Sequence, residues 1–174
     1  EKGCVMHVDG AGSKPIISYL YAKETGDYSW FRGLAQDVIA MNVDDLICVG
    51  ANALCFVDYL AFNSKLLPRR ALIGALASGF KDVLEFMEEL GSPLAFLGGE
   101  TAELPDQLLT LDISGAVFGV VDVRWVIDGA RIREGDVIVG LRSGGRSRFE
   151  RFNSGIMCNG ITLARRALLS DEYR

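Results

Sequence analysis

Short apolar runs and longer helical patterns follow one another along this chain without a fixed repeat. Runs rich in β-branched or aromatic residues predict strands at residues 3–8, 53–62, 94–97, 110–121 and 137–141. Apolar residues at helical spacing predict helices at residues 29–49, 68–90 and 161–169, and residues 16–23 fit a short helix or an extension of the first strand. Irregular alternation of the two kinds favours an α+β fold over a doubly wound parallel sheet.

Composition narrows the possible partners and compartment. The chain has 174 residues, enough for one domain or one domain with the start of another, and a net charge of −5 without a basic stripe, which argues against nucleic acid. No apolar run approaches the roughly 20 residues of a membrane helix. The four cysteines are Cys4, Cys48, Cys55 and Cys158, and they form no CxxC pair. The single histidine, His7, cannot complete a zinc site with them, so we expect His7 to be structural. We expect the cysteines to be buried free thiols in a reducing cytoplasm.

A Gly-rich segment, Asp9–Lys14, directly follows the first predicted strand. Gly10 and Gly12 permit backbone angles and close approach that a Cβ would block, and successive amides in such a loop can bind an anion. Asp9 could then hold Mg²⁺ and Lys14 could meet a phosphate. The alternative is an ordinary Gly-rich turn with a solvated Asp9 and Lys14.

An acidic pair, Asp44 and Asp45, lies near the end of the helix predicted at residues 29–49. Neighbouring helical positions point about 100° apart, so the two carboxylates cannot face one site equally well. Asp37 and Asp44 share a face, and Asp45 lies on the next one. Acidic residues near a helix C-terminus oppose the helix dipole, which favours a bound cation, although a solvated acidic end is the alternative.

A third segment, Gly98–Pro105, begins where the predicted strand at residues 94–97 ends. Its paired glycines stand beside the carboxylates of Glu100 and Glu103, a combination that suits a nucleotide-phosphate and metal site. A tight turn at the two glycines is the alternative reading.

Weaker signals lie elsewhere in the chain. Small polar residues at 153–155 and 158–160 open the last helix and could accept an anion or form an interdomain hinge. The Arg-rich stretch at 142–151 reads as a solvated loop with a possible phosphate contact. Asp58 lies in an apolar strand and needs polar partners, whether these are structural hydrogen bonds or a ligand.

Taken in order, these segments resemble the amino-terminal domain of phosphoribosylformylglycinamidine cyclo-ligase, also called aminoimidazole ribonucleotide synthetase. The shared pieces are Asp9–Lys14, Asp44–Leu46 with Gly50–Ala51, Asp58–Tyr59, Gly98–Pro105 and Cys158–Gly160. Asp44 replaces the usual Asn, so Asp45 is the metal candidate of the pair. Ala53 stands where Pro is common in the family and Cys158 where Ser is usual.

The resemblance implies an α+β domain with a mixed, mostly antiparallel sheet and helices on one face. It implies Mg²⁺ held by Asp9, Asp45 and Glu100. The residues that it implies for ATP and its phosphates are Asp9, Gly10, Gly12, Lys14, Asp45, Gly98, Gly99, Glu100, Thr101 and Asn159, with Glu103 as a further candidate. It also implies a cytoplasmic homodimer, with an ATP-binding domain at residues 1–150 and a linker with the first helix of a second domain at 151–174.

The implied activity is ATP-dependent cyclisation of formylglycinamidine ribonucleotide to aminoimidazole ribonucleotide, in purine biosynthesis. The pattern singles out no catalytic side chain, and phosphoryl transfer needs positioning and charge neutralisation more than a protein nucleophile. Two alternatives stay open. One is another ATP-dependent kinase or ligase of the superfamily, similar to thiamine-monophosphate kinase or a hydrogenase-maturation protein. The other is a non-catalytic nucleotide-binding module that dimerises.

Overall fold

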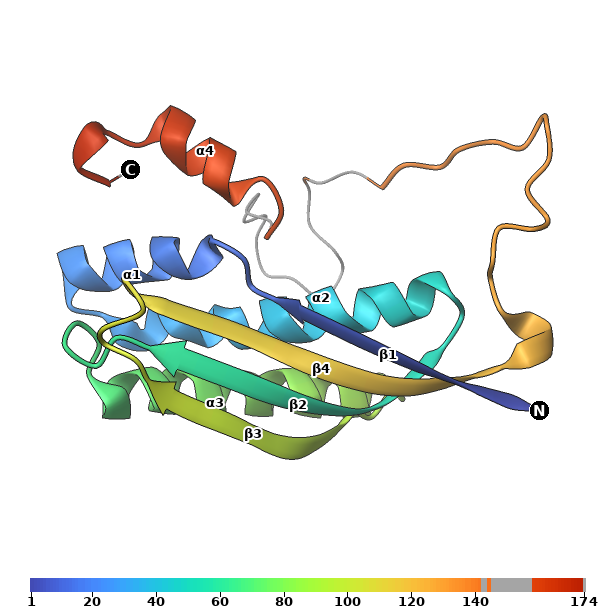
Figure 1. Ribbon diagram of the computed structural model, residues 1–174, viewed down its shortest axis with the longest axis horizontal. Coiled ribbons are helices and arrows are strands. Elements are labelled where there is room, and N and C mark those ends of the chain that lie inside the picture. Colours follow the sequence, from blue (N-terminus) through green and yellow to red (C-terminus); the bar gives the residue numbers. More distant parts are fainter. Residues whose placement is uncertain (142–143, 145–157, 174) are drawn as a thin grey trace. The chain divides into compact units, whose positions relative to one another are not determined.

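The computed structural model describes residues 1–141, 144 and 158–173 (Figure 1). The chain divides into two compact units, residues 1–127 and 128–174, each of which is described by itself. The domain boundary expected at residues 150/151 lies outside the described residues. So do the segment 153–155 and, apart from residue 144, the Arg-rich stretch.

A four-stranded mixed sheet forms the centre of unit 1. Its strands are β1 (Lys2–Gly10), β2 (Asn52–Phe62), β3 (Ala95–Glu103) and β4 (Leu111–Asp122). They lie in the order β1-β4-β2-β3, with β4 antiparallel to both of its neighbours and β2 parallel to β3. The expected mixed, mostly antiparallel sheet is confirmed, and β1 and β3 are its two edges.

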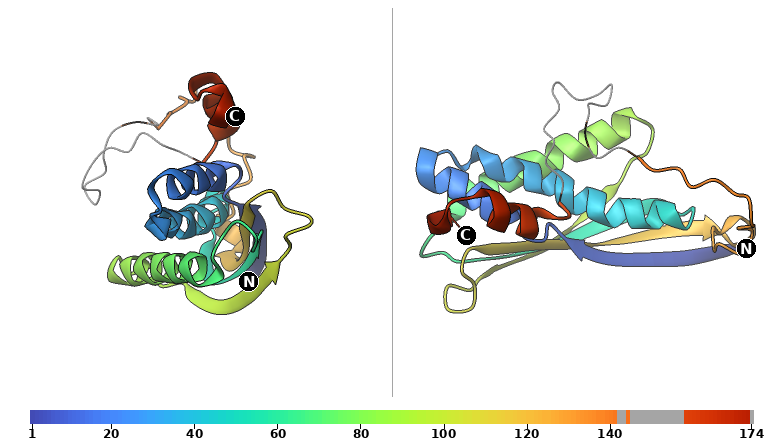
Figure 2. Two further views of the ribbon diagram at one scale, coloured as in Figure 1. Left: turned by 90° about the vertical axis from the view of Figure 1, so that its left-hand side faces the viewer. Right: turned by 90° about the horizontal axis from the view of Figure 1, so that it is seen from above.

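Helices cover one face of this sheet (Figure 2). They are α1 (Lys14–Thr25), the short 3₁₀ helix η1 (Tyr28–Arg32), α2 (Gly33–Cys48) and α3 (Arg69–Glu89). The helix predicted at residues 29–49 is therefore η1 continued by α2. A second 3₁₀ helix, η2 (Val123–Trp125), follows β4.

Local sequence explains where these helices begin and end. Pro15 lies in the first turn of α1, where its missing N–H costs nothing, and Gly26 ends the helix with φ 73°, a left-handed angle that favours glycine. Pro68 caps the start of α3. Within α3, Gly79 lies so close to the carbonyl oxygen of Arg32 that a Cβ there would overlap it. A glycine at this position lets α3 pack directly against η1.

The two faces of the sheet differ sharply in burial. On β4 the side chains that face the helices are buried, among them Ile113 and Val117. The opposite side, which we call the open face, carries Met6 and Val8 at 71% and 69% exposure. Val57 and Tyr59, paired in register with Ala116 and Ser114, are also exposed on it, at 40% and 39%. Alternation along each strand thus gives one packed side and one exposed, partly apolar side.

Several local predictions are corrected. The strand predicted at 94–97 does not stop at Gly98 and Gly99 but continues through them to Glu103, so the tight-turn reading is wrong. The strand predicted at 137–141 is absent: these described residues are irregular. The cysteines are free as expected, but Cys4 and Cys48 are exposed rather than buried.

Unit 2 contains α4 (Ile161–Leu168), close to the helix predicted at 161–169, and a last 3₁₀ helix, η3 (Asp171–Tyr173). Gly160, with φ 80°, immediately precedes α4. In the part of the chain that the structure describes, every helix is too short or too polar to cross a bilayer.

Candidate functional site

The Gly-rich segment follows β1 directly and leads into α1. Asp9 is in register with Gly115 of β4, so its side chain lies on the helix side of the sheet. Its Oδ1 accepts a hydrogen bond from the N–H of Gly10 at 2.7 Å. The N–H of Ala11 donates to the carbonyl of Ile113 at 3.0 Å, and Gly12 has φ 58°. Strand pairing and a left-handed glycine therefore hold the loop in place.

The two acidic candidates Asp9 and Asp45 border one seam between β1 and α2. The Nε2 of His7 lies 2.7 Å from Oδ2 of Asp45. His7 and Asp9 are two residues apart on β1 and so face the same side. The Asp45 side chain is 56% exposed, which leaves it accessible to a ligand. His7, expected to be structural, thus contacts a candidate metal ligand directly.

Asp44 has a different environment from Asp45. Partial burial, and then the neighbouring charge of Asp45, raise the pKa of Asp44 above its usual range. His7 contacts Asp45. Neighbouring helical positions point about 100° apart, so Asp44 is directed away from that contact.

Lys14, predicted to meet a phosphate, has a partner within the protein. Its Nζ lies 2.7 Å from Oδ1 of Asp37 on α2, and both side chains are mostly buried, with 20% and 16% exposure. Among the described residues, the buried Oδ2 of Asp37 has no hydrogen-bond partner. The pair ties the start of α1 to α2, a contact across 23 residues that spacing alone does not reveal.

Sequence reasoning missed Asn42, which is fully buried on α2. Its carboxamide bonds to both main-chain groups of Asp9, in each case at 3.1 Å. The helical pattern does contain a signal: a polar residue stands at position 42, close after the buried Val38 and Ile39. Such a residue needs hydrogen-bond partners when it is buried.

The paired glycines have roles within the sheet. The register between β2 and β3 shifts between Phe56 and Asp58, because Phe56 pairs with Phe96 but Asp58 pairs with Gly99. Gly98, with φ 102°, lies at this bulge in β3. Gly99 faces Asp58, and a Cβ at position 99 would overlap the Asp58 carboxylate and carbonyl oxygens.

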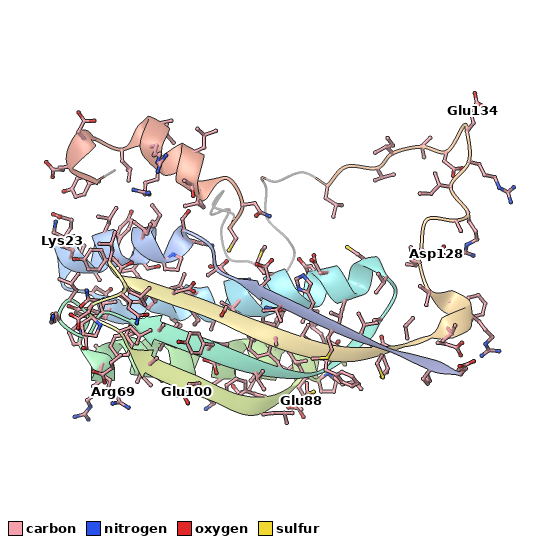
Figure 3. All side chains as sticks on the ribbon, in the orientation of Figure 1. Lys23, Arg69, Glu88, Glu100, Asp128 and Glu134 are labelled. Atoms are coloured by element: carbon pink, nitrogen blue, oxygen red, sulfur yellow. The ribbon has the colours of Figure 1, made fainter. Side chains whose placement is uncertain are left out.

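Glu100 is not brought to Asp9 and Asp45 within one chain. It pairs with Tyr59 and so lies on the open face, whereas Asp9 lies on the helix side. It also belongs to β3, the edge opposite β1 (Figure 3). Its Oε1 accepts a hydrogen bond from the N–H of Thr101 at 2.7 Å. In the described ranges, no three His, Cys, Asp or Glu side chains gather as a metal-binding group.

Thr101 and Glu103 occupy other surroundings. Thr101 pairs with Leu60 on the helix side of the sheet. Glu103 forms an ion pair with Arg69 at 2.9 Å, which joins the end of β3 to the start of α3. Asn159 belongs to unit 2, where it is exposed just before α4. The predicted nucleotide residues are therefore dispersed: Asp9 and Asp45 border the β1–α2 seam, Lys14 contacts Asp37, Gly98 to Thr101 belong to β3, and Asn159 belongs to unit 2.

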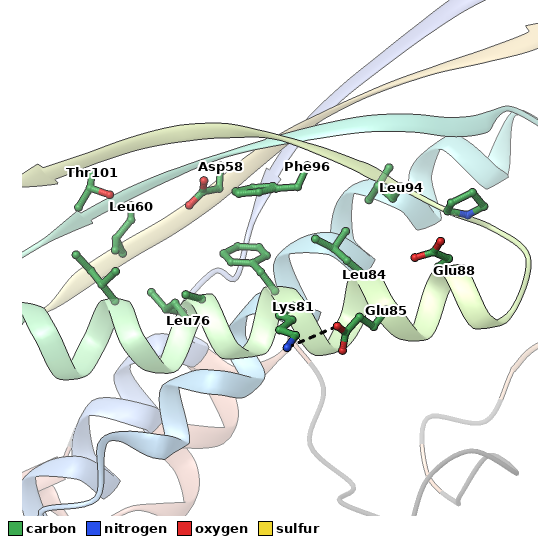
Figure 4. Close-up of a pocket in the computed structure, with 14 residues that line it drawn as sticks. Asp58, Leu60, Leu76, Lys81, Leu84, Glu85, Glu88, Leu94, Phe96 and Thr101 are labelled. Carbon is green, nitrogen blue, oxygen red and sulfur yellow. Dashed lines mark ion pairs between the residues drawn. The ribbon is translucent and has the colours of Figure 1, made fainter.

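A groove of about 510 Å³ lies between α3 and the strands β2 and β3 (Figure 4). Asp58 and Phe96 point into it from the sheet. Burial raises the pKa of the Asp58 carboxyl above its usual range. Lys81 forms an ion pair with Glu85 across 3.7 Å on the facing helix. The lining is apolar with more carboxylates than amines, so the groove is poorly suited to a triphosphate.

The sequence of this chain matches known proteins over most of its length. Residues 1–121 match the family model described as AIR synthase related protein, N-terminal domain. The chain is 38% identical over 161 residues to phosphoribosylformylglycinamidine cyclo-ligase from Thermococcus kodakarensis, covering 92% of this chain and 41% of that protein. It is 36% identical over 173 residues to the same-named protein from Methanobrevibacter smithii, covering 98% of this chain and 43% of that protein. The chain thus spans about two fifths of these relatives.

Solved structures share the fold at lower sequence identity, and they belong to proteins with other names. A structure described as AaThiL complexed with AMPPCP and TMP superposes with a TM-score of 0.56 at 18% identity, covering 75% of this chain and 36% of that one. The hydrogenase maturation protein HypE in complex with ATP gives a TM-score of 0.51 at 19% identity, covering 75% and 34%. At this identity the likeness establishes the fold alone. The family match over residues 1–121, together with the cyclo-ligase relatives, identifies the chain as a member of the AIR synthase related family that carries its N-terminal domain.

Proposed function

We propose that this chain is the ATP-binding part of a phosphoribosylformylglycinamidine cyclo-ligase, which converts formylglycinamidine ribonucleotide to aminoimidazole ribonucleotide in cytoplasmic purine biosynthesis. The observation that carries the proposal is the 38% identity to a cyclo-ligase over 92% of this chain. The position of Asp9 on the same side of β1 as His7, which contacts Asp45, supports it. The relatives are longer than this chain, so we assign the complete activity to a protein of their length that contains this chain. We call that protein the full-length protein.

The proposed reaction transfers the γ-phosphoryl group of ATP to the amide oxygen of the substrate. The internal amine nitrogen then attacks the activated carbon and gives up a proton, the new C–N bond closes the ring, and the C–O bond to phosphate breaks. ADP and inorganic phosphate leave. The protein's part is to hold the reactants in line and to offset phosphate charge, which requires no protein nucleophile.

The donor set at the β1–α2 seam fits a magnesium–nucleotide complex. Mg²⁺ prefers oxygen ligands and is commonly held by one or two carboxylates together with phosphate oxygens and water. Asp9 and Asp45 supply two carboxylates, and His7 contacts Asp45 in the way that groups around a metal site orient its ligands. When bound, Mg²⁺ would neutralise charge on the phosphate oxygens of ATP.

Lys14 would assist from the start of α1. An ammonium group carries three donors, so its contact with Asp37 does not exhaust it. The Asp37 carboxylate would hold Lys14 beside the loop, and Gly10 and Gly12 would let phosphate approach the backbone.

The proposed assembly is a homodimer paired through the open faces. Met6, Val8 and Val57 expose apolar surface there, and such surface on a sheet favours a protein contact. Glu100 lies on the same face as these residues. In this proposal Glu100 contacts a nucleotide that is bound near the dimer interface, and it does not share a metal ion with Asp9 and Asp45 of its own chain.

A direct assay tests the proposal against its rivals. The full-length protein is incubated with Mg-ATP and either formylglycinamidine ribonucleotide or thiamine monophosphate, and ADP and ribonucleotide products are measured. We expect aminoimidazole ribonucleotide and ADP from the first substrate only. Turnover of thiamine monophosphate alone would indicate a kinase of the superfamily. Nucleotide binding without turnover of either substrate would indicate a non-catalytic module.

A further inference from the structure

The carboxamide of Asn42 makes hydrogen bonds through both of its ends, although it is fully buried. Its Oδ1 accepts from the N–H of Asp9 at 3.1 Å, and its Nδ2 donates to the carbonyl of Asp9 at 3.1 Å. The same Nδ2 donates to the carbonyl of Val38, one turn earlier in α2, at 2.9 Å. The last bond fixes the rotamer of Asn42, so the amide is held ready for Asp9.

These bonds reach Asp9 from the helix side of the sheet. Asp9 is directly opposite Gly115 of β4, and two residues later the N–H of Ala11 donates to the carbonyl of Ile113, directly opposite it. Main-chain groups of alternate residues point to the same side of a strand, so those of Asp9 point toward β4. The carboxamide of Asn42 contacts the same N–H and C=O and ties this point of β1 to α2.

The consequence reaches the two carboxylates of the proposed metal site. Asn42 and Asp45 are three residues apart on α2 and lie on adjacent turns of one face. Asn42 therefore fixes the main chain of Asp9 to the same helical surface that carries Asp45. Without it, the distance between the two carboxylates would depend on β1 and the glycines that follow.

We propose that Asn42 is a positioning residue, which sets Asp9 relative to Asp45 so that both reach one Mg²⁺–nucleotide complex. The inference rests on the proposed function and adds a residue that does not itself touch the nucleotide. Groups that orient metal ligands in this way commonly change metal affinity by about 10- to 100-fold when removed.

The chain offers a matched control in Asn63, which is 8% exposed. Its Nδ2 donates to the carbonyl of Leu108 at 2.9 Å, and its Oδ1 accepts from the N–H of Lys65 at 3.0 Å. Asn63→Ala thus removes a buried, main-chain-binding carboxamide that has no bond to Asp9. Both Asn42→Ala and Asn63→Ala should lower the melting temperature.

The test measures Mg-ATP affinity of the full-length protein by calorimetry, well below both melting temperatures. We expect about tenfold weaker binding or more for Asn42→Ala and parent-like binding for Asn63→Ala. Amide hydrogen exchange should also show faster exchange at Asp9 in Asn42→Ala, with the amide of Val117 unchanged. Equal loss of affinity in both variants, or parent-like affinity in Asn42→Ala, would overturn the inference.

Asp9→Asn separates failure of this inference from failure of the proposed site. If Asp9→Asn weakens Mg-ATP binding and Asn42→Ala does not, the site stands and the positioning role is wrong. If Asp9→Asn binds like the parent, the proposed site itself is wrong. Should Asn42→Ala fail to fold, Asn42→Ser supplies the same comparison with a smaller loss of polarity.

Discussion

Asp58 of β2 lies against Gly99 of β3, and its carboxyl group fills the space that a side chain at position 99 would need. The relationship links two pieces of sequence that looked separate, a carboxylate in an apolar strand and a pair of glycines before Glu100. It also explains why β3 runs through the glycines: Gly98 forms the bulge and Gly99 leaves room for its neighbour.

We expect Gly99→Ala to destabilise the protein by about 1–3 kcal/mol, the usual cost of forcing extra atoms into a packed position. The new Cβ would overlap main-chain as well as side-chain oxygen of Asp58, so a rotamer change alone cannot relieve it. Urea unfolding of parent and variant measures the difference. A variant as stable as the parent would show that the two strands are not this close.

The carboxyl group of Asp58 should make the stability of the fold depend on pH. Burial raises the pKa of Asp58 in the folded protein above its ordinary value of 3.8, so ionisation favours the unfolded chain. The stabilisation that the folded protein gains from protonated Asp58 is complete below pH 3.8, and it is lost as the pH rises through the folded-state pKa. Asp58→Asn should therefore melt at a higher temperature than the parent at pH 7, and the advantage should shrink toward pH 3.8. An advantage that is constant across this range would contradict the assignment.

We expect a glycine-to-alanine substitution to have opposite effects on stability at two positions of α3. Gly79→Ala should cost about 1–3 kcal/mol, because its Cβ would overlap the carbonyl oxygen of Arg32. Gly74 is exposed, with open space where a Cβ would lie, and Gly74→Ala should stabilise by roughly 0.5–1 kcal/mol through helix propensity. Thermal unfolding of both variants tests the packing of α3 on η1. A loss of stability in both, or in neither, would contradict it.

The open face predicts the oligomeric state. Met6 is 71% exposed on that face, so Met6→Lys should leave the fold intact and convert a homodimer to monomers. Leu109→Lys is the control, since Leu109 is 90% exposed in the connection between β3 and β4. Sedimentation velocity distinguishes the species. Dimers of Met6→Lys as stable as those of the parent would place the contact elsewhere.

Much of unit 1 could be predicted from local pattern. The apolar stripe of α2, the proline before α3 and the alternation in β4 each act over a few residues, and the structure confirms those elements. Glycines at 98 and 99 misled the prediction, because their roles depend on Asp58, about 40 residues away in sequence. The apolar run at 137–141 resembles a strand, but an isolated run has no ladder to join.

The sequence named the residues of the candidate site but only part of their arrangement, and their roles stay predictions. The motif order named Asp9 and Asp45, and the structure brings them to one seam. It separates Glu100 from them, because register decides the face of a strand and a shift of one residue reverses it. Asn42 acts through contacts 33 residues apart in sequence, which no local pattern reveals.

The central claim is that Asp45, and not the adjacent Asp44, helps to hold magnesium and nucleotide. Calorimetric titration of the full-length protein with Mg-ATP tests it most directly, with Asp45→Asn and Asp44→Asn compared at equal ionic strength. Both variants remove one carboxylate charge at almost the same place on α2 without changing side-chain size. We expect Asp45→Asn to weaken binding by about tenfold or more and Asp44→Asn to bind within about twofold of the parent. Equal affinities in the two variants would contradict the claim.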